Sequence, residues 1–441
     1  MKKIKRIHII FRYSVITLLS FFLKGCIETV PLETEGYEDI IVIEALLTDE
    51  FKEQEIQISR SYRFEDSLAV KETGAEVRVV DDAQRTFTFL EASPGIYKSE
   101  EAFSPSQDRT YQLQISTTDG RSYRSDFVKP EPPASLEKVY AERTVTDDGF
   151  EGIGIFVDSD GFSDQPGYFR YEYEETFLLE SPFWNRSLIV PPGELPSITE
   201  FEILLYNFEF DLKPKDFEDR ICYRTEVSNS LIFTDTENQF NNKVRGFRVR
   251  FVEMGDYRLR DRYSINVTQI SQSRDTHRFY ELLDKFSESE NIFSQIQTGF
   301  IEGNIDADTD SNEQVLGLFS ISSISKKRIF LDFEDFFPEA PLPDYIGVCV
   351  RNINYNPNLA AIREEIEENQ LDAGRIIAFM VVRTQKDMRD TELRYFFTSS
   401  LTGQLESGTR YLINNIPIMV PNRCADCRIF GSTIKPDFWE D

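Results

Sequence analysis

The sequence predicts a mainly β protein, in which an N-terminal immunoglobulin-like β-sandwich is followed by a larger β-rich (α+β) domain with few helices. Three observations lead to this fold class. Short runs rich in β-branched and aromatic residues recur along most of the chain. Turn-forming residues separate these runs, and only two segments show clearly the spacing of an amphipathic helix.

The immunoglobulin-like unit is predicted for residues 39–129. Its seven short β-type runs in about ninety residues match such a sandwich in number and spacing. Ile56 and Ile58 alternate with polar neighbours, and Asp119-Gly120 is a strong hairpin signal. No cysteine falls within the unit, so no disulfide is expected between its sheets. The runs are residues 40–47, 55–59, 75–80, 86–90, 95–98, 111–117 and 121–127.

A proline-rich linker, residues 130–135, follows because three closely spaced prolines cannot continue a central strand. The second unit, residues 136–441, is again strand-like but has longer loops. Its clearest helices are residues 275–286 and 358–369, each with apolar residues on one face. No fixed-period repeat is visible, which argues against a propeller or a solenoid. The strand candidates are residues 152–157, 168–179, 201–210, 231–234, 245–252, 263–270, 316–320, 328–333 and 376–383.

The N-terminus has the layout of a secretory signal. Five basic residues precede an apolar run at residues 13–23 that is too short to span a bilayer. Leu23-Lys24-Gly25-Cys26 resembles a bacterial lipobox, in which the cysteine thiol is acylated and becomes the new N-terminus. We therefore expect a lipoprotein signal peptide at residues 1–25, lipidation of Cys26 and a tether at residues 26–38. An uncleaved signal anchor, or an ordinary signal peptide with a chance cysteine, is the alternative.

The charge balance excludes a large class of partners. Cleavage after residue 25 leaves 43 basic against 77 acidic residues, a formal charge of −34. Nucleic-acid binding needs a basic footprint, and polybasic membrane binding needs clusters of lysine and arginine. Neither pattern occurs in the sequence, so we expect no nucleic-acid partner, and we expect the lipid on Cys26 to provide the attachment to a membrane.

Residue types for catalysis are scarce. His8 lies in the signal, and His277 lies near the start of a predicted helix, where we interpret it as a surface residue. A single imidazole cannot build a multi-histidine zinc site, and no phosphate-binding loop, GxSxG motif or dinucleotide fingerprint occurs. Paired carboxylates of the glycosidase type stay open because acidic residues are abundant. The pair Phe183-Trp184 is interpreted as packing rather than as a sugar platform.

One acidic stretch raises the question of a metal site. Asp306, Asp308, Asp310 and Asn312 alternate as ligands in a calcium loop do. An EF-hand needs glycine at the sixth position and glutamate at the twelfth, and this chain has serine and glycine there, so the EF-hand is rejected. A solvated loop is the favoured interpretation, beside a calcium site of another type, and no cofactor is predicted.

Once Cys26 carries lipid, an even number of cysteines remains, which suggests two disulfides in an oxidising compartment. Sequence alone allows three connectivities. Cys424 and Cys427 are close enough to pair locally, which would leave Cys222 with Cys349. A redox role for this CxxC motif is disfavoured, because it follows two prolines and lies near the C-terminus rather than at the start of a helix after a strand.

The C-terminal tail carries a resemblance to a known family. Cys424-Ala425-Asp426-Cys427, Gly431-Ser432-Thr433 and Lys435-Pro436-Asp437-Phe438-Trp439 resemble the ending of the Bacteroidetes lipoprotein family called domain of unknown function 4249. The family has no established activity. The resemblance implies a lipid-anchored outer-membrane protein of the cell envelope, commonly associated with TonB-dependent receptors that import nutrients. Other similar stretches are Gly74-Ala75, Pro94-Gly95-Ile96-Tyr97, Cys222-Tyr223, Arg262-Tyr263-Ser264-Ile265 with Val267 and Gln269, Gly303-Asn304-Ile305, and Leu316-Gly317 with Phe319-Ser320.

The last residues allow two interpretations. Phe438 and Trp439 either dock on the last domain and fix the C-terminus, or form an exposed recognition peptide for a partner. We favour docking, because large aromatic side chains are usually buried.

Two classes of function follow from the sequence. The first is a non-enzymatic accessory or ligand-binding lipoprotein of a TonB-dependent nutrient receptor, with a small-molecule or glycan ligand that the sequence does not identify. The alternative is an envelope hydrolase that acts on glycans through paired carboxylates. A purely structural role in the envelope cannot be separated from the first class by sequence.

Overall fold

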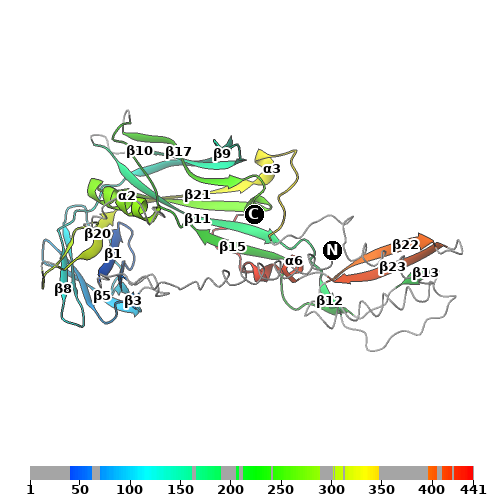
Figure 1. The fold of residues 1–441 in the computed structure, drawn as a ribbon, viewed down its shortest axis with the longest axis horizontal. Helices are drawn as coiled ribbons and strands as arrows, with labels where there is room; N and C mark the ends of the chain where they lie inside the picture. Colours follow the sequence, from blue (N-terminus) through cyan, green and yellow to red (C-terminus); the bar gives the residue numbers. More distant parts are fainter. Residues whose placement is uncertain are drawn as a thin grey trace, which may run out of the picture.

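The computed structural model describes residues 40–61, 70–160, 165–189, 205–207, 212–239, 242–288, 301, 303–310, 313–346, 396–404, 410–419 and 422–440. In these ranges the protein is mainly β, as the sequence predicts, with several sheets and few helices (Figure 1). The N-terminal sheet lies at one end of the molecule, and two layered sheets lie beside it.

Ten strands form the N-terminal sheet. They are hydrogen-bonded in the order β19-β8-β7-β4-β5-β6-β2-β1-β20, and β3 pairs with β2. Ile56 and Ile58, which alternate with polar residues in the sequence, are both buried. The finer assignment of an immunoglobulin-like sandwich stays a prediction. The strands are β1 (Ile41–Thr48), β2 (Glu55–Arg60), β3 (Val70–Lys71), β4 (Glu76–Asp81), β5 (Thr86–Ser93), β6 (Ile96–Ser99), β7 (Tyr111–Ser116), β8 (Ser122–Ser125), β19 (Ile305–Ala307) and β20 (Val315–Ser322).

Two strands of this sheet come from far along the chain. β20 pairs in parallel with β1, from Ile41 opposite Val315 to Thr48 opposite Ser322. β19 pairs with β8 at the other end of the strand order. The sequence places both segments in the unit of residues 136–441, so the predicted boundary does not separate the two units in space.

Residues 303 and 304 join the two ends of the N-terminal sheet. The side chain of Asn304 bonds both backbone groups of Phe319 in β20: Nδ2 donates to the carbonyl and Oδ1 accepts from the amide, each at 2.8 Å. Gly303 lies against the backbone of Gly317, because a Cβ at residue 303 would be 1.6 Å from the Gly317 carbonyl oxygen. The side-chain amide of Asn304 thus makes the hydrogen bonds to β20 that a neighbouring strand would otherwise make, at the point where β19 and β20 meet.

The N-terminal sheet continues without a break into the second part of the molecule. β20 leads into β21 (Ile324–Asp332) through the single residue Ser323. Asp49 holds this crossing, because one carboxylate oxygen accepts from the Ser323 hydroxyl at 2.5 Å and the other from the Ile324 amide at 2.9 Å. The two parts are therefore joined by consecutive strands with a single residue between them.

The linker residue Glu131 gives this junction a pH dependence. Its amide donates to the Ile321 carbonyl in β20 at 2.9 Å. Burial raises the pKa of its carboxyl from 4.5 to about 7. The folded chain therefore holds this proton more tightly than the unfolded chain. The resulting contribution to stability is complete below about pH 4.5 and is lost as the pH rises through 7.

We expect Glu131→Gln, which keeps the shape of the neutral acid, to abolish this loss. Between pH 5 and pH 8 the wild-type chain should lose roughly 2 kcal/mol of unfolding free energy beyond what the variant loses. Urea unfolding at both pH values measures the difference. Glu100→Gln, which removes an exposed carboxylate, is the control and should behave as wild type. Equal pH dependence of the wild type and Glu131→Gln would contradict the prediction.

Two sheets pack face to face in the second part of the molecule. The β9 sheet has the order β17-β10-β9, and the β11 sheet has the order β15-β11-β18-β21 with β16 on β11. Ile153, Ile155 and Val157 of β10 share a fully buried core with Phe169 and Tyr171 of β11. The strands are β9 (Ser135–Val145), β10 (Glu151–Asp160), β11 (Tyr168–Glu180), β15 (Ile221–Val227), β16 (Ile232–Asp235), β17 (Lys243–Glu253) and β18 (Arg262–Gln272).

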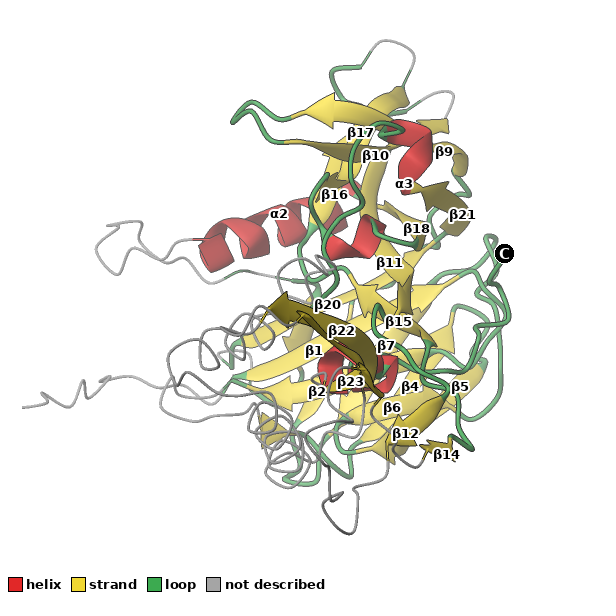
Figure 2. Ribbon diagram, turned by 90° about the vertical axis from the view of Figure 1, so that its right-hand side faces the viewer, coloured by secondary structure: helices red, strands yellow, loops and turns green. Residues whose placement is uncertain are grey.

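Helices are few among the described residues, and α2 is much longer than the others (Figure 2). α2 (Arg274–Glu288) confirms the helix predicted at residues 275–286, whereas the one predicted at 358–369 lies outside the described residues. None of these helices is long and apolar enough to cross a membrane. The other elements are α3 (Phe333–Phe336), α6 (Asn422–Ala425), the 3-10 helices η2 (Tyr257–Leu259) and η3 (Cys427–Ile429), and the strands β12 (Ser187–Ile189), β13 (Leu205–Asn207), β14 (Leu212–Pro214), β22 (Phe396–Gln404) and β23 (Arg410–Met419).

Candidate functional site

α3 lies at the end of the layered sheets that points away from the N-terminal sheet (Figure 1). A groove opens beside this helix. Its volume of about 370 Å³ is within the range of small-molecule sites. Three segments that are distant in the sequence form it: the β9–β10 hairpin, the residue after β17 and the turn after α3. The main lining residues are Arg143, Glu151, Met254, Phe337, Pro338 and Glu339.

An ion pair occupies the centre of the groove. Arg143 Nε donates to Glu151 Oε1 at 2.6 Å. The two side chains meet because β9 and β10 are antiparallel neighbours, with Arg143 opposite Ile153, two residues from Glu151 on the same face. The guanidinium also lies 4.9 Å from the centroid of the Phe337 ring, which is 2% exposed and closes the bottom of the groove.

The groove combines polar and apolar recognition groups. Arg143 has guanidinium N–H groups beyond those on Glu151, and Glu151 and Glu339 supply carboxylate oxygens. Met254 and Pro338 add apolar surface. Such a combination suits a ligand or a partner segment that carries polar and apolar groups side by side.

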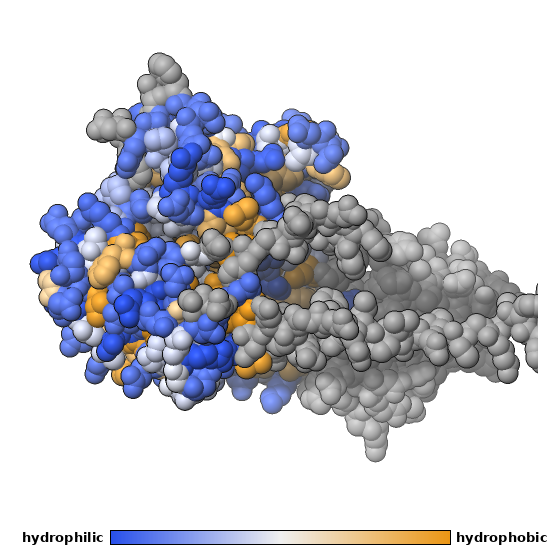
Figure 3. Space-filling view, turned by 60° about the vertical axis from the view of Figure 1, so that its left-hand side comes forward, coloured by the Kyte–Doolittle hydropathy of each residue, from blue (hydrophilic) through white to orange (hydrophobic). Residues whose placement is uncertain are grey.

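The hairpin tip beside the groove, residues 145–150, exposes two hydrophobic side chains. Val145 is 59% exposed and Phe150 is 54% exposed. In the turn between them, Thr146 Oγ1 accepts from the Phe150 amide at 3.1 Å, and Gly149 has φ +87°, a conformation that favours glycine. Figure 3 shows a face on which hydrophilic residues cover most of the described surface and hydrophobic ones form smaller patches. The tip thus presents an exposed valine and an exposed phenylalanine beside the groove.

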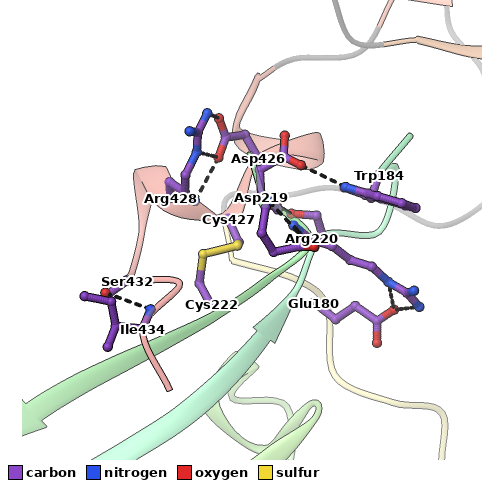
Figure 4. The surroundings of a disulfide bond; sticks show 12 residues. Glu180, Trp184, Asp219, Arg220, Cys222, Asp426, Cys427, Arg428, Ser432 and Ile434 are labelled. Atoms are coloured by element: carbon purple, nitrogen blue, oxygen red, sulfur yellow. Dashed lines mark hydrogen bonds and ion pairs between the residues drawn. A yellow bond between two sulfur atoms is a disulfide. The ribbon is translucent and has the colours of Figure 1, made fainter. Parts of the chain in front are cut away.

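The cysteines of the tail pair differently from the expectation. Cys222 of β15 forms a disulfide with Cys427, 205 residues away in sequence (Figure 4). The local pair Cys424–Cys427 is therefore wrong, and so is the pair Cys222–Cys349. Cys424 is disulfide-bonded as well, whereas Cys349 lies outside the described residues. The local pair fails because Cys427 begins η3, two residues after α6 ends, and its amide donates to the Asp219 carbonyl next to β15 at 3.0 Å.

A buried carboxylate next to this disulfide holds the predicted aromatic pair. Asp219, which is fully buried, accepts from Trp184 Nε1 at 2.8 Å and from Lys215 Nζ at 2.6 Å. The Arg220 guanidinium lies 5.5 Å from the centroid of the indole ring. Phe183 packs against the core cluster. These contacts put Phe183 and Trp184 in packing, as the sequence interpretation has it, rather than on a sugar platform.

The last two aromatic residues lie across a face of the β11 sheet, where Trp439 contacts residues of both edge strands, β15 and β21. Trp439 is 5% exposed, and its ring meets Tyr223 of β15 at 5.0 Å and Phe330 of β21 at 5.6 Å between centroids. Phe438 is 36% exposed, with the Arg328 guanidinium 3.5 Å from its ring centroid. Trp439 is thus docked, whereas Phe438 keeps part of its surface open to solvent.

Comparison with known families decides where this chain belongs. The model of the family described as "Domain of unknown function (DUF4249)" matches residues 27–328. The chain belongs to this family. The match includes the N-terminal sheet and the β9 sheet and ends before α3 and the tail. No curated protein and no solved structure matches the chain.

In this DUF4249 chain the calcium candidates are surface carboxylates. Asp306, Asp308 and Asp310 are exposed, and Asp308 Oδ2 accepts from Arg124 at 2.8 Å. Within the described ranges, no group of three or more histidine, cysteine, aspartate or glutamate residues could hold a metal ion. Asn312 and the predicted lipidation site Cys26 lie outside the described residues.

The interpretation of His277 as a surface residue is wrong. The imidazole is 5% exposed and lies between the rings of Tyr168 and Phe233, at 5.3 and 5.4 Å between centroids. Its Nδ1 lies 3.2 Å from Gln272 Oε1. Burial lowers the pKa of His277, so the ring stays neutral in this packing. His277 lies in the first turn of α2 and faces β11 and β16. The helical spacing of Phe279 and its neighbours did not predict this orientation.

Sequence reasoning missed a buried ion cluster between the two sheets of the DUF4249 chain. Glu175 of β11 is 4% exposed and accepts from Arg250 Nε at 3.1 Å and from the Tyr263 hydroxyl at 2.7 Å. Arg258 Nε lies 3.4 Å from its other oxygen. The sequence did contain a sign of this cluster. Glu175 lies between the aromatic residues at 173 and 177, and the two-residue period of a strand puts all three on the inward face of β11. Both carboxylate oxygens are engaged, so the cluster binds the two sheets to each other.

Proposed function

We propose that this DUF4249 chain is a Bacteroidetes outer-membrane lipoprotein, anchored through lipid on Cys26, that acts as a non-enzymatic accessory or ligand-binding partner of a TonB-dependent nutrient receptor. The observation that carries the proposal is the groove at Arg143 with the exposed hairpin tip beside it. The Cys222–Cys427 disulfide supports the location, because such bonds persist in oxidising compartments such as the envelope.

The hairpin tip has the features of a protein contact. Binding energy at interfaces is concentrated in a few aromatic and arginine side chains that lose water on contact. Phe150 supplies an exposed aromatic ring, and Arg143 supplies a guanidinium whose charge Glu151 already balances. A partner could therefore cover both without burying an unpaired charge.

We expect the tagged protein, extracted from its own membrane in mild detergent, to bring with it a large β-barrel receptor in near-stoichiometric amount. Phe150→Asp should reduce this receptor at least tenfold, because it places a charge on the contact surface. Phe51→Asp is the matched control, since Phe51 is 78% exposed in the turn between β1 and β2, away from the groove. Mass spectrometry with an isotope-labelled standard measures the ratio.

Location and partnership are tested separately. Cys26→Ala should move the chain out of the membrane fraction, as the lipid anchor requires. A chain that stays in that fraction would contradict the anchor. A chain that comes out of the membrane alone, or one whose receptor is retained in Phe150→Asp, would contradict the partnership at the hairpin tip.

A second candidate function arises from the same groove. Glu151 and Glu339 both line it, and a pair of carboxylates is the machinery of glycoside hydrolysis. A hydrolase would release reducing ends from a glycan, and Glu339→Gln would stop that release. Receptor capture without any such release favours the accessory function.

A further inference from the structure

The outer face of the β9 sheet carries a row of aromatic side chains. Alternation along β10 sends Ile153, Ile155 and Val157 into the core, so Phe156 points to the opposite face. Phe156 lies opposite Tyr140 of β9 on one side and opposite Arg248 of β17 on the other. The β9 sheet forms the outermost layer of this part of the molecule, so its outer face points away from the packed core (Figure 1).

Two glycines of β10 leave the space that two of these rings occupy. A Cβ at Gly154 would lie 2.6 Å from a carbon of the Phe156 ring, and a Cβ at Gly152 would lie 2.7 Å from a carbon of the Phe251 ring. Each ring therefore lies directly over a glycine of β10, and a side chain at that glycine would displace the ring. The rings of Tyr140 and Phe156 stack at 5.7 Å between centroids with 25° between their planes. All three rings are partly exposed, so one side of the row is open to solvent.

Charged side chains surround these rings without forming ion pairs with one another. Lys138, Glu142 and Arg248 are exposed and form no ion pair within the described part of the chain. Arg248 instead lies 5.6 Å from the centroid of the Phe251 ring. Most other described arginines are bonded to carboxylates, so unpaired charges around an aromatic row are unusual in this molecule.

Tyr140 contributes its hydroxyl to the same face. The negative charge of Asp158 acts on this hydroxyl, and Asp158 Oδ1 accepts from the Gly246 amide at 2.8 Å. Burial, together with the Asp158 and Glu142 carboxylates, raises the pKa of Tyr140 and keeps the phenol neutral. The aromatic row thus has hydrogen-bond donors and acceptors fixed at its border.

We propose that this surface, the aromatic face formed by Tyr140, Phe156 and Phe251 with their charged border, binds a neutral glycan. A pyranose ring has an apolar face of C–H groups that can lie on an aromatic ring, and hydroxyls at its rim that both donate and accept hydrogen bonds. Glu142 and Asp158 can accept from such hydroxyls, while Lys138 and Arg248 can donate to them. Strands lie about 4.8 Å apart, so the face from β9 to β17 spans roughly 10 Å, enough for two sugar rings.

The charge of the face selects an uncharged ligand. Its border holds two cations, Lys138 and Arg248, against three carboxylates, Glu142, Asp158 and Glu253, so the charges nearly cancel. A polyanion would meet the carboxylates and the net charge of −28 of the whole chain. An apolar protein partner would bury these charges without partners, at a high cost in free energy. Glycan binding at this face does not depend on the receptor partnership proposed above.

The test uses the purified full-length mature protein and isothermal calorimetry with cellohexaose, mannohexaose, xylohexaose and maltohexaose. We expect at least one of them to bind with a dissociation constant below about 1 mM. Tyr140→Ala and Phe156→Ala should each weaken binding at least tenfold. The matched control is Phe51→Ala, which removes a 78% exposed ring from the turn between β1 and β2, away from the β9 sheet, and should leave the affinity unchanged.

Two further variants distinguish a loss of binding from a loss of folding. Glu142→Gln and Arg248→Ala change exposed side chains without ion pairs, so the variants should melt as wild type and still bind at least threefold more weakly. The proposal is overturned if the folded wild type binds none of the four glycans, or if all variants of the aromatic face bind as wild type does. Tighter binding of polygalacturonate than of every neutral glycan also overturns it.

Discussion

Gly303→Ala is expected to lower the unfolding free energy by more than about 4 kcal/mol, an unusually large effect for one methyl group. The added Cβ would lie 1.6 Å from the carbonyl oxygen of Gly317 and 2.7 Å from its carbonyl carbon. Neither backbone can move away freely. Gly317 is held in β20 opposite Ile43, and the next residue, Asn304, is bonded twice to Phe319. The methyl group would therefore break the contact at which the sheet is closed.

Urea unfolding followed by far-ultraviolet circular dichroism measures this effect. The matched control is Gly255→Ala, because a Cβ at Gly255 meets nothing within 4 Å and its backbone is not in the left-handed region. The control should stay within about 0.5 kcal/mol of wild type. A Gly303→Ala chain as stable as the control would mean that residues 303 and 317 do not touch in solution.

Loss of the Cys222–Cys427 disulfide is expected to have an effect of similar size. In the chain-entropy description, a cross-link that closes a loop of 205 residues stabilises the folded chain by about 5 kcal/mol. The double variant Cys222→Ala, Cys427→Ala leaves no new unpaired thiol from this bond. Because Cys427 leads directly into the segment that ends with Trp439, the loss should also free the tail from β15.

Two measurements follow this loss. Urea unfolding gives the free energy, and tryptophan emission should shift to longer wavelength as Trp439 gains contact with water. Ile434→Ala is the control, because this side chain is 77% exposed in the same tail and its removal should change stability by less than about 0.5 kcal/mol. If the double variant kept both its stability and its emission, packing alone would hold the tail.

Local chemistry predicts much of this fold. Asp119-Gly120 forms the expected hairpin: Gly120 has φ +88°, and β7 pairs with β8 on either side of it. Alternation in the sequence likewise identified the inward residues of β2. Pairing over long separations has no such local signal, so nothing in residues 315–322 indicated that they would lie beside β1. The disulfide partner of Cys427 was hidden for the same reason.

The stretches that carry the family resemblance meet one another in space. Gly303-Asn304 contacts Gly317 and Phe319 across the closure of the N-terminal sheet. The hydroxyl of Tyr97 accepts from the Ala75 amide at 3.0 Å, which joins two more of these stretches. Cys222-Tyr223 lies against the tail. These residues hold the scaffold together, whereas the groove at Arg143 lies in stretches the resemblance does not mark.

The groove and the aromatic face could not be read from the sequence for a different reason. Phe337 reaches Arg143 only because the chain returns along β21, nearly two hundred residues later. Tyr140, Phe156 and Phe251 look in sequence like ordinary strand residues. Whether these rings are buried or reach solvent depends on which face of the β9 sheet packs against the β11 sheet. The packing of the two sheets, and not the sequence, shows which face that is.

The parallel pairing of β1 with β20 decides how the protein carries a mechanical load. A force applied to the chain upstream of Ile41 pulls β1 along its own axis, while β20 is held at its opposite end through Ser323 and β21. All the hydrogen bonds between the two strands are then loaded together in shear instead of opening one after another. A protein held by its N-terminus would resist pulling through this pair of strands, and its lifetime under force would be set by the rate at which they slide apart.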